Sequence, residues 1–317
     1  MIMENIDGRN LEIELHKITQ ISILDIELSN KIYSYISKYF NDKKYNIHND
    51  KSNENNQKIT TNNFEDLSKR RYSCISINNF EDIDKILENK KDSILMKYNK
   101  KKMENLDIVK EIEELEYKYN IILDKLKSTY SENSLIKLNE LKVNIEDILQ
   151  KNIVPYIEVQ ETVYKKIYQL INILKDFEYE ENVILFLHNV DTYLTEEEYK
   201  KIESIVREQK NIKMIMSSKC KNYFDYKRVE EIIFLYKGNI EYLPDIEIML
   251  TKVNKCINKN VEISSDELLE FLKIKSFNII KREYKEDTNT KLIYEALLEK
   301  EKNYNFDIID MEKTIII

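Results

Sequence analysis

Short apolar runs of strand length recur along the chain, and helical patterns separate them. Residues 183–187 form an unbroken apolar run, and a second apolar run spans 212–216. Such runs are typical of parallel strands that are buried on both faces. Between them, Thr195 and Glu198 form a capping box, which predicts a helix over 195–208. The order strand, helix, strand indicates one half of an open α/β sheet.

The same alternation begins in the N-terminal part of the chain. Residues 11–16 alternate apolar and polar positions, and residues 18–26 predict a more buried strand. Apolar residues at three- and four-residue spacing then predict a helix over 28–40. The next buried strand is expected at 72–77 and the last strand of the sheet at 231–236.

Long charged helices interrupt this pattern between the third strand and the run at 183–187. Within them, six apolar residues follow one another at spacings of four and three, which is a near-heptad stripe. They are Ile108, Ile112, Leu115, Tyr119, Ile122 and Leu126. The stripe fits a helical hairpin that packs on itself, and it equally fits an oligomer seam. We expect an α/β head at 1–90 and 180–240, a helical leg at 91–179 and a mainly helical C-terminal extension at 241–317.

Glycine content excludes two common nucleotide-binding loops. The chain of 317 residues has 2 glycines, Gly8 and Gly238, which are far apart. A Walker A loop and a dinucleotide fingerprint each need two glycines close together. At the turn after the strand predicted at 18–26, Asp25 and Glu27 stand where a phosphate would need backbone donors, and their carboxylates would repel it. The sequence therefore predicts no bound ATP.

The polar residues after the run at 183–187 also argue against nucleotide hydrolysis. In P-loop nucleotide triphosphatases, acidic residues here hold Mg²⁺ and position the attacking water. This chain has His188 and Asn189, with Asp191 beyond them. A neutral imidazole and an amide bind Mg²⁺ poorly, so the pattern predicts a degenerate P-loop-ATPase-like scaffold without the chemistry. A buried strand with no further role explains the run at 183–187 as well.

Charge and cysteine content add expectations about partners and compartment. The net charge of −8 argues against non-specific nucleic-acid binding, although a basic stripe on an otherwise acidic protein could still bind nucleic acid. Cys74, Cys220 and Cys256 show no paired spacing, which suits free thiols in a reducing cytosol. No signal peptide and no membrane-spanning apolar run is present in the sequence given. We expect a cytoplasmic protein without a membrane partner.

Two stretches concentrate basic residues. The polar stretch 41–71 ends in a basic triplet at 69–71, and residues 217–228 (SSKCKNYFDYKR) interleave basic and aromatic side chains. Both patterns suit phosphate contacts with nucleic acid. A solvated surface run is the commoner explanation for such a triplet, and aromatics that anchor a loop to the core also explain the second stretch.

Residues 183–219 (VILFLHNVDTYLTEEEYKKIESIVREQKNIKMIMSSK) and 222–236 (NYFDYKRVEEIIFLY) resemble the Csn-two family, the CRISPR type II-A accessory proteins of spacer acquisition. Residues 72–180 are similar to the helical leg of that family in length and character. The resemblance covers about 1–240, and the segment 246–317 looks like the extension of the long subtype.

The resemblance implies a non-enzymatic homotetrameric ring that holds an end of double-stranded DNA through phosphate contacts, independent of sequence. It also implies Ca²⁺ ions in the leg, and an integrase pair and an effector nuclease as protein partners. The candidate DNA-binding residues are Lys43, Lys44, Lys69, Arg70, Arg71, Lys219, Lys221, Lys227 and Arg228. The candidate Ca²⁺ ligands are Glu132, Asn139, Glu140, Glu146 and Asp147. A solvated helix face explains these acids as well.

Two other functions remain open from the sequence. A P-loop ATPase or nuclease fits the order of strands and helices, although the missing glycines and His188 argue against it. A helical scaffold that recruits protein partners without binding DNA fits the apolar stripe and the charged helices.

Overall fold

The structure is a computed structural model. It describes residues 1–6, 8–41, 59–60, 72–91, 93–129, 161–176, 182–256 and 264–281. The chain divides into two compact units, one formed by Met1–Asn79 with Phe177–Ile317 and the other by Phe80–Asp176. The predicted division into head, leg and extension remains a prediction.

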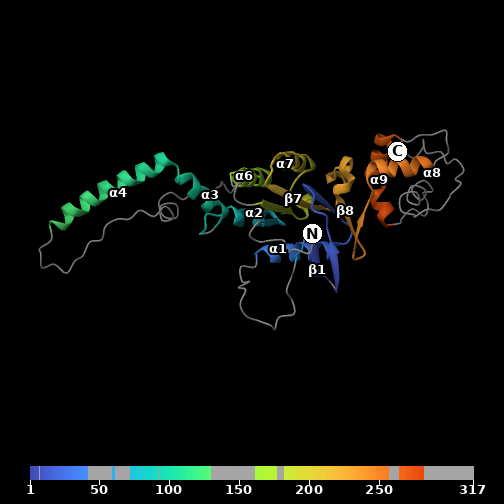
Figure 1. Cartoon of the computed structure of the whole chain (residues 1–317), viewed down its shortest axis with the longest axis horizontal. Coiled ribbons are helices and arrows are strands. Elements are labelled where there is room, and N and C mark those ends of the chain that lie inside the picture. Colours follow the sequence, from blue (N-terminus) through green and yellow to red (C-terminus); the bar gives the residue numbers. More distant parts are fainter. Residues whose placement is uncertain are drawn as a thin grey trace. The chain divides into compact units, whose positions relative to one another are not determined.

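A six-stranded, mostly parallel sheet forms the centre of the first unit (Figure 1). Its order is β5-β6-β7-β3-β8-β9, in which only β9 runs antiparallel to its neighbour. The strands are β3 (Ile18–Ile23), β5 (Tyr72–Ile77), β6 (Asn182–Leu187), β7 (Ile212–Ser218), β8 (Ile232–Tyr236) and β9 (Asn239–Tyr242). The prediction of an α/β fold with added helical parts is therefore confirmed.

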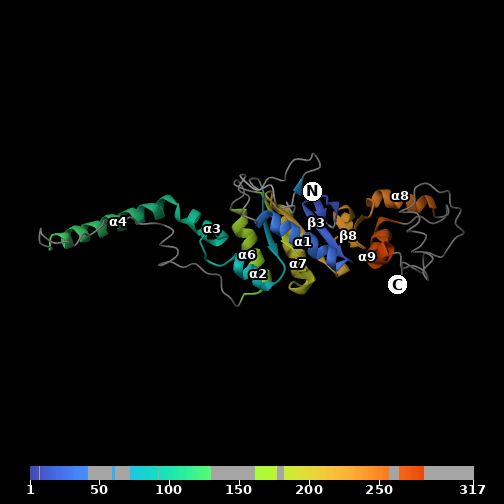
Figure 2. The ribbon, with the colours of Figure 1, turned by 90° about the horizontal axis from the view of Figure 1, so that it is seen from below.

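Helices α1 (Ile26–Asn41) and α7 (Glu196–Glu208) lie over opposite faces of this sheet in Figure 1 and overlap in the perpendicular view of Figure 2. The alternation of side chains along each strand produces the two faces. Ile21, Phe186 and Ile215 pack in one buried cluster with α1. The thirteen-residue helix α7 begins at the predicted capping box, where the Thr195 hydroxyl accepts the backbone N–H of Glu198.

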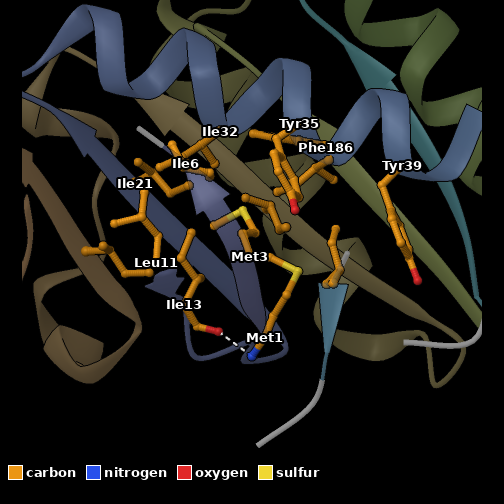
Figure 3. Close-up of a cluster of buried hydrophobic side chains, with 14 of the residues drawn as sticks. Met1, Met3, Ile6, Leu11, Ile13, Ile21, Ile32, Tyr35, Tyr39 and Phe186 are labelled. Carbon is orange, nitrogen blue, oxygen red and sulfur yellow. Dashed lines mark hydrogen bonds between the residues drawn. The ribbon is translucent and has the colours of Figure 1, made fainter. Parts of the chain in front are cut away.

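A small antiparallel sheet, β2-β1-β4, completes the core on the α1 side. Its strands are β1 (Ile2–Ile6), β2 (Arg9–Glu12) and β4 (Ile59–Thr60). Figure 3 shows Met1, Met3 and Leu11 packing between this sheet and α1. The predicted strand at 11–16 is wrong in its extent, because β2 spans Arg9–Glu12. Directly after β2, Ile13 exchanges backbone hydrogen bonds with Met1.

One arginine joins the second face of the main sheet to α7. Arg207 donates hydrogen bonds to Glu203 within α7 and to Glu231, which immediately precedes β8. Its Nη2 lies 2.6 Å from Glu203 Oε1 and 2.7 Å from Glu231 Oε2. Although burial lowers the pKa of Arg207, the hydrogen bonds that it donates to Glu231 and Glu203 raise this pKa overall. The guanidinium therefore stays charged and neutralises two nearly buried carboxylates.

The C-terminal part of the first unit is helical where the structure describes it. Helices α8 (Ile246–Cys256) and α9 (Ser265–Lys281) contact each other, and α9 also packs on β8. Ser264 caps the start of α9, since its hydroxyl accepts the Glu267 N–H and its own N–H donates to the Glu267 carboxylate.

The second unit is all helical where it is described. It contains α2 (Phe80–Ile86), α3 (Ile94–Met103), α4 (Leu106–Lys127) and α6 (Val163–Lys175). Helix α6 buries Ile167, Leu170 and Leu174, and α2 and α3 both contact this helix. None of the described helices is long and apolar enough to cross a membrane.

Candidate functional site at the carboxyl edge of the sheet

His188 follows β6 at the edge where parallel strands end, and its ring is almost fully buried, with 1% of the residue exposed. Its Nε2 lies 3.1 Å from the Asn30 side-chain oxygen, and its Nδ1 lies 2.7 Å from the Ser217 hydroxyl. Because the Asn30 oxygen only accepts, the assigned geometry places the ring proton on Nε2, and Ser217 donates to Nδ1. The Ser217 oxygen in turn accepts the backbone N–H of Asn189 at 3.0 Å.

The surroundings of His188 keep it neutral. Burial, followed by the positive charge of Lys219, lowers the pKa of His188 to about 4. The Tyr33 ring from α1 stacks on the imidazole at 4.5 Å between centroids, with 14° between the planes. With both nitrogens engaged and one face covered, the imidazole joins β6, β7 and α1. It has no free nitrogen with which to act as a base or a metal ligand.

Asn189 shapes the turn that follows. Its backbone is left-handed, with φ 52° and ψ 47°, a conformation that asparagine tolerates better than most residues. Its carbonyl accepts the N–H and the hydroxyl of Thr192, and its side-chain amide donates to Asn78 at 3.2 Å. In the place where a P-loop enzyme orients water, this residue is held by contacts within the chain.

Asp191 connects the turn after β6 to the segment that follows β7. Its carboxylate accepts the backbone N–H of Lys219 at 3.2 Å and lies 3.8 Å from the Cys220 thiol. Burial and the charge of Asp191 raise the pKa of Cys220, so this exposed cysteine is a poor nucleophile at neutral pH. Cys74 is buried, and its burial raises its pKa to about 12.

Asp25 occupies the position at which a P-loop would hold phosphate. Strand β3 ends at Ile23, so the strand predicted to reach residue 26 is shorter, and Asp25 begins α1 instead. One carboxylate oxygen accepts the backbone N–H of Leu28 at 3.0 Å, and the other accepts the N–H of Gly238 at 2.7 Å. Helix N-termini are natural anion sites. Here the chain supplies the anion itself.

The sequence did not predict the contacts of two residues near Asp25, which are Gly238 and Glu27. Gly238 has φ 74° and follows Lys237 with φ 48°, a pair of positive angles typical of the two-residue turn that joins β8 to β9. Glu27 is exposed and forms an ion pair with Lys31 at 2.6 Å, so it faces solvent and not a phosphate.

The structure separates the described basic candidates into two pairs. Lys219 and Lys221 follow the carboxyl end of β7, and the Lys221 ammonium lies 3.4 Å from the Ile274 carbonyl of α9. Lys227 and Arg228 precede the amino end of β8, where Arg228 lies 3.6 Å from Asp225. Between the pairs the chain crosses one face of the sheet, so the four residues do not form a single cluster.

The aromatic residues between these pairs point inward. Tyr223 donates to the Leu194 carbonyl at 2.7 Å, and the Tyr226 hydroxyl lies 3.0 Å from Ser276 Oγ in α9. Phe224 is also buried and lies against the Phe277 ring. They anchor the loop to the core and to α9, as one of the two interpretations of the sequence expected, and they offer no stacking platform for bases.

The remaining site predictions lie outside the described residues. This holds for the basic residues Lys43, Lys44, Lys69, Arg70 and Arg71 and for the proposed calcium ligands Glu132, Asn139, Glu140, Glu146 and Asp147. Across the described ranges, no group of three or more His, Cys, Asp or Glu residues could hold a metal ion. The calcium and DNA assignments of these ten residues stay predictions.

Some of the residues that build this edge could have been found in the sequence. Asp25 lies three residues before Leu28, at the start of an amphipathic pattern, which is an N-cap signal. Ser217 and Asn30 carry no such signal, because their contact with His188 depends on the strand order and on the position of α1.

No protein-family model matches the chain, and no curated protein matches it either. Among solved structures, it is similar to the crystal structure of Stu0660 of Streptococcus thermophilus, with a TM-score of 0.77, 18% identity and coverage of 100% of both chains. At this level of identity, the similarity shows a shared fold over the whole length and nothing about activity.

Proposed function

We propose that this chain is a non-enzymatic protein that binds ends of double-stranded DNA without sequence preference, as a homotetrameric ring, and supports CRISPR spacer acquisition. We assign it to the long subtype of the Csn-two family. The residue patterns at 183–219 and 222–236 support the family assignment. The Asp25 carboxylate takes the position where a P-loop would hold a phosphate, and this observation supports the proposal that the protein is not an enzyme.

Electrostatics explain why Asp25 opposes nucleotide binding. A phosphate bound at the start of α1 would lie close to the carboxylate that caps this helix. Two like unit charges 4 Å apart repel by ~4 kcal/mol near a protein surface, which is about a thousandfold in affinity. The backbone N–H of Leu28 is already taken, so a phosphate would also lose that donor.

The contents of the carboxyl edge argue against hydrolysis as well. His188 is neutral, buried and hydrogen-bonded at both nitrogens, and Asn189 cannot accept a proton. Asp191 accepts the Lys219 N–H. A nuclease or ATPase would need a base or a metal ligand here, and these side chains are committed to holding β6, β7 and α1 together.

DNA binding by an acidic chain requires locally concentrated positive charge. Lys219 is exposed beside the carboxyl edge, and Lys227 and Arg228 are exposed before β8. These residues, together with the candidates outside the described ranges, would contact phosphates from one or more subunits. The family resemblance further implies Ca²⁺ in the leg, and an integrase pair and an effector nuclease as partners.

A gel-shift titration against linear and covalently closed duplexes of the same sequence tests the proposal. We expect linear duplex alone to bind, more weakly as salt rises, and we expect a chelator to weaken binding if Ca²⁺ braces the leg. Sedimentation of the free protein should show a tetramer. A strictly monomeric protein with no duplex affinity at low salt would contradict the proposal.

A helical scaffold that recruits proteins without binding DNA is the second candidate. The observation in its favour is the apolar stripe of α4, where Leu115 is 59% exposed and Ile122 is 63% exposed. Only Ile112 among its six residues is half-buried. Retention of a protein partner by a protein with no duplex affinity would favour this function over the first.

A further inference from the structure

We propose that helix α9, in the C-terminal part of the chain, is a strap that holds the segment between β7 and β8 in position for phosphate contacts. We call this segment, residues 219–231, the β7–β8 connection. Ser276 and Phe277 of α9 are its positioning residues. The choice of duplex DNA as the ligand rests on the proposed function. The connection carries the four described basic candidates, Lys219, Lys221, Lys227 and Arg228.

The β7–β8 connection lacks the element that usually covers such a crossing. Strands β7 and β8 run parallel on either side of β3. A connection between parallel strands usually contains an α-helix, which packs on the sheet. The structure describes every residue of this connection, and it contains two 3₁₀ helices in place of an α-helix, η3 (Lys221–Tyr223) and η4 (Tyr226–Glu231). Another element must therefore cover β8 on this face.

Helix α9 takes the place of the missing crossover helix. It packs on both β8 and η4, and Figures 1 and 2 both show it beside β8. Between centroids, the Phe277 ring lies 6.3 Å from the Phe224 ring of the connection and 6.2 Å from the Phe234 ring of β8. Phe224 and Phe234 are both buried. One side chain of α9 thus packs against the connection and against the strand that follows it.

A buried hydrogen bond gives α9 a second hold on the connection. The Tyr226 hydroxyl at the start of η4 lies 3.0 Å from Ser276 Oγ, and the two residues are 5% and 1% exposed. Burial raises the pKa of Tyr226 to about 12, so this hydroxyl keeps its proton at neutral pH. A buried hydroxyl that loses its partner is destabilising, because water does not replace that partner. Ser276 therefore sets the position of η4 relative to α9.

The head and α9 hold opposite sides of the connection. Tyr223 donates to the Leu194 carbonyl, and the Asp225 N–H donates to the side-chain oxygen of Gln20 in β3 at 2.8 Å. The backbone of Phe224 is extended, with φ −89° and ψ 139°, so neighbouring side chains alternate in direction. Tyr223 therefore contacts the head, whereas Phe224 faces α9. The head contacts alone leave the second side of the connection uncovered.

The basic residues lie next to these anchors and remain at the surface. Lys227 and Arg228 directly follow Tyr226, and both are exposed. The Lys221 ammonium reaches α9 itself, at 3.4 Å from the Ile274 carbonyl. Burial of the aromatic side chains thus fixes the backbone from which the basic side chains project. A backbone that is ordered before the ligand arrives lowers the entropy cost of binding.

The test compares three variants of the full chain with the wild type. The strap variant, Ser276→Ala with Phe277→Ala, removes the partner of Tyr226 and the ring against Phe224, and it changes no charge. Tyr226→Phe is a milder variant that keeps the ring and deletes the hydroxyl, and it serves if the strap variant does not fold. Ile36→Ala is the matched control, because it leaves a cavity at a fully buried side chain of α1 on the opposite face of the same sheet.

Amide hydrogen exchange tests the strap without DNA. Because local opening sets the exchange rate, we expect residues 221–230 to exchange at least about tenfold faster in the strap variant than in wild type, with β3 and β6 unchanged. Tyr226→Phe should show the same change to a smaller extent, and Ile36→Ala should show no selective change there. Exchange in the connection that matches wild type in the strap variant, or that rises equally in the control, would overturn the inference.

Affinity for a linear duplex tests whether the position of the connection matters for binding. If the connection stays in place in a tenth of the strap-variant molecules, the apparent Kd rises about tenfold, whereas Ile36→Ala should stay within about twofold of wild type. Faster exchange with wild-type affinity would overturn the positioning role and leave the proposed function standing. A wild-type protein that binds no duplex at low salt would overturn the proposed function and the choice of ligand, and the exchange rates would still decide whether α9 holds the connection.

Discussion

Removal of the Asp25 carboxylate tests whether the chain's own anion holds the start of α1. Asp25→Ala deletes an acceptor that binds the N–H of Leu28 at the helix start and the N–H of Gly238 in the β8–β9 turn. Loss of an N-cap costs about 1 kcal/mol. Loss of the charge at the helix N-terminus costs about 0.5 kcal/mol, and loss of a charge-assisted hydrogen bond about 1.5 kcal/mol. The expected decrease in the free energy of unfolding is therefore about 3 kcal/mol.

Two further variants separate these contributions. Asp25→Asn keeps one acceptor oxygen but lacks the charge and the second oxygen, so we expect a loss of about 1.5–2 kcal/mol. Glu27→Ala is the control, because Glu27 lies in the same helical turn and has an exposed side chain (79%). It should change the free energy of unfolding by less than about 0.5 kcal/mol.

Urea unfolding followed by circular dichroism measures these differences, provided that the slope of the transition is unchanged. The order wild type, Glu27→Ala, Asp25→Asn, Asp25→Ala should appear in the midpoints. An Asp25→Ala midpoint that matches Glu27→Ala would refute the role of this carboxylate as the anchor of α1 and the hairpin.

Three further predictions concern other contacts. The pKa of His188 is about 4 in the folded chain and 6.5 ordinarily, so the unfolded chain binds a proton first as pH falls through 6.5, and the loss of stability is complete below about 4. The free energy of unfolding should therefore be about 2 kcal/mol lower at pH 5 than at pH 7. The variant His188→Gln should remove this difference. Arg207→Ala leaves Glu231 and Glu203 without their partner at 7% and 11% side-chain exposure and should lower the free energy of unfolding by about 3 kcal/mol; a loss below about 1 kcal/mol in urea would contradict this. Leu115→Glu combined with Ile122→Glu changes two exposed residues of the α4 stripe and should leave the melting temperature of dilute protein nearly unchanged, whereas a large decrease would show that the stripe is packed within the protein.

The buried parallel strands were the most predictable part of the fold. Strand β5 begins and ends where the sequence indicated, and β6 begins one residue early, because strands covered on both faces must be apolar throughout. The start of α7 was equally visible, since its capping box is a local pattern. Strands β1 and β4 were not foreseen. β4 has two residues, and the burial of β1 depends on packing against α1.

The site was less predictable than the strands because it depends on distant neighbours. The sequence showed that His188 and Asn189 replace acids, but the hydrogen bond from Ser217 to His188 requires β6 to lie beside β7. The four basic residues at 219–228 form one stretch in the sequence. In the fold, Lys219 follows the carboxyl end of β7, whereas Arg228 precedes the amino end of β8.

Access to DNA ends tests the central claim most directly. A labelled linear duplex with biotin at both ends is mixed with the protein, and streptavidin is added either before or after the protein. We expect no complex when the ends are blocked first. When they are blocked afterwards, we expect a complex that resists moderate salt, because a ring threaded by DNA is then trapped. Equal binding in both orders, lost to the same extent in salt, would show that the protein binds along the duplex and would contradict the account.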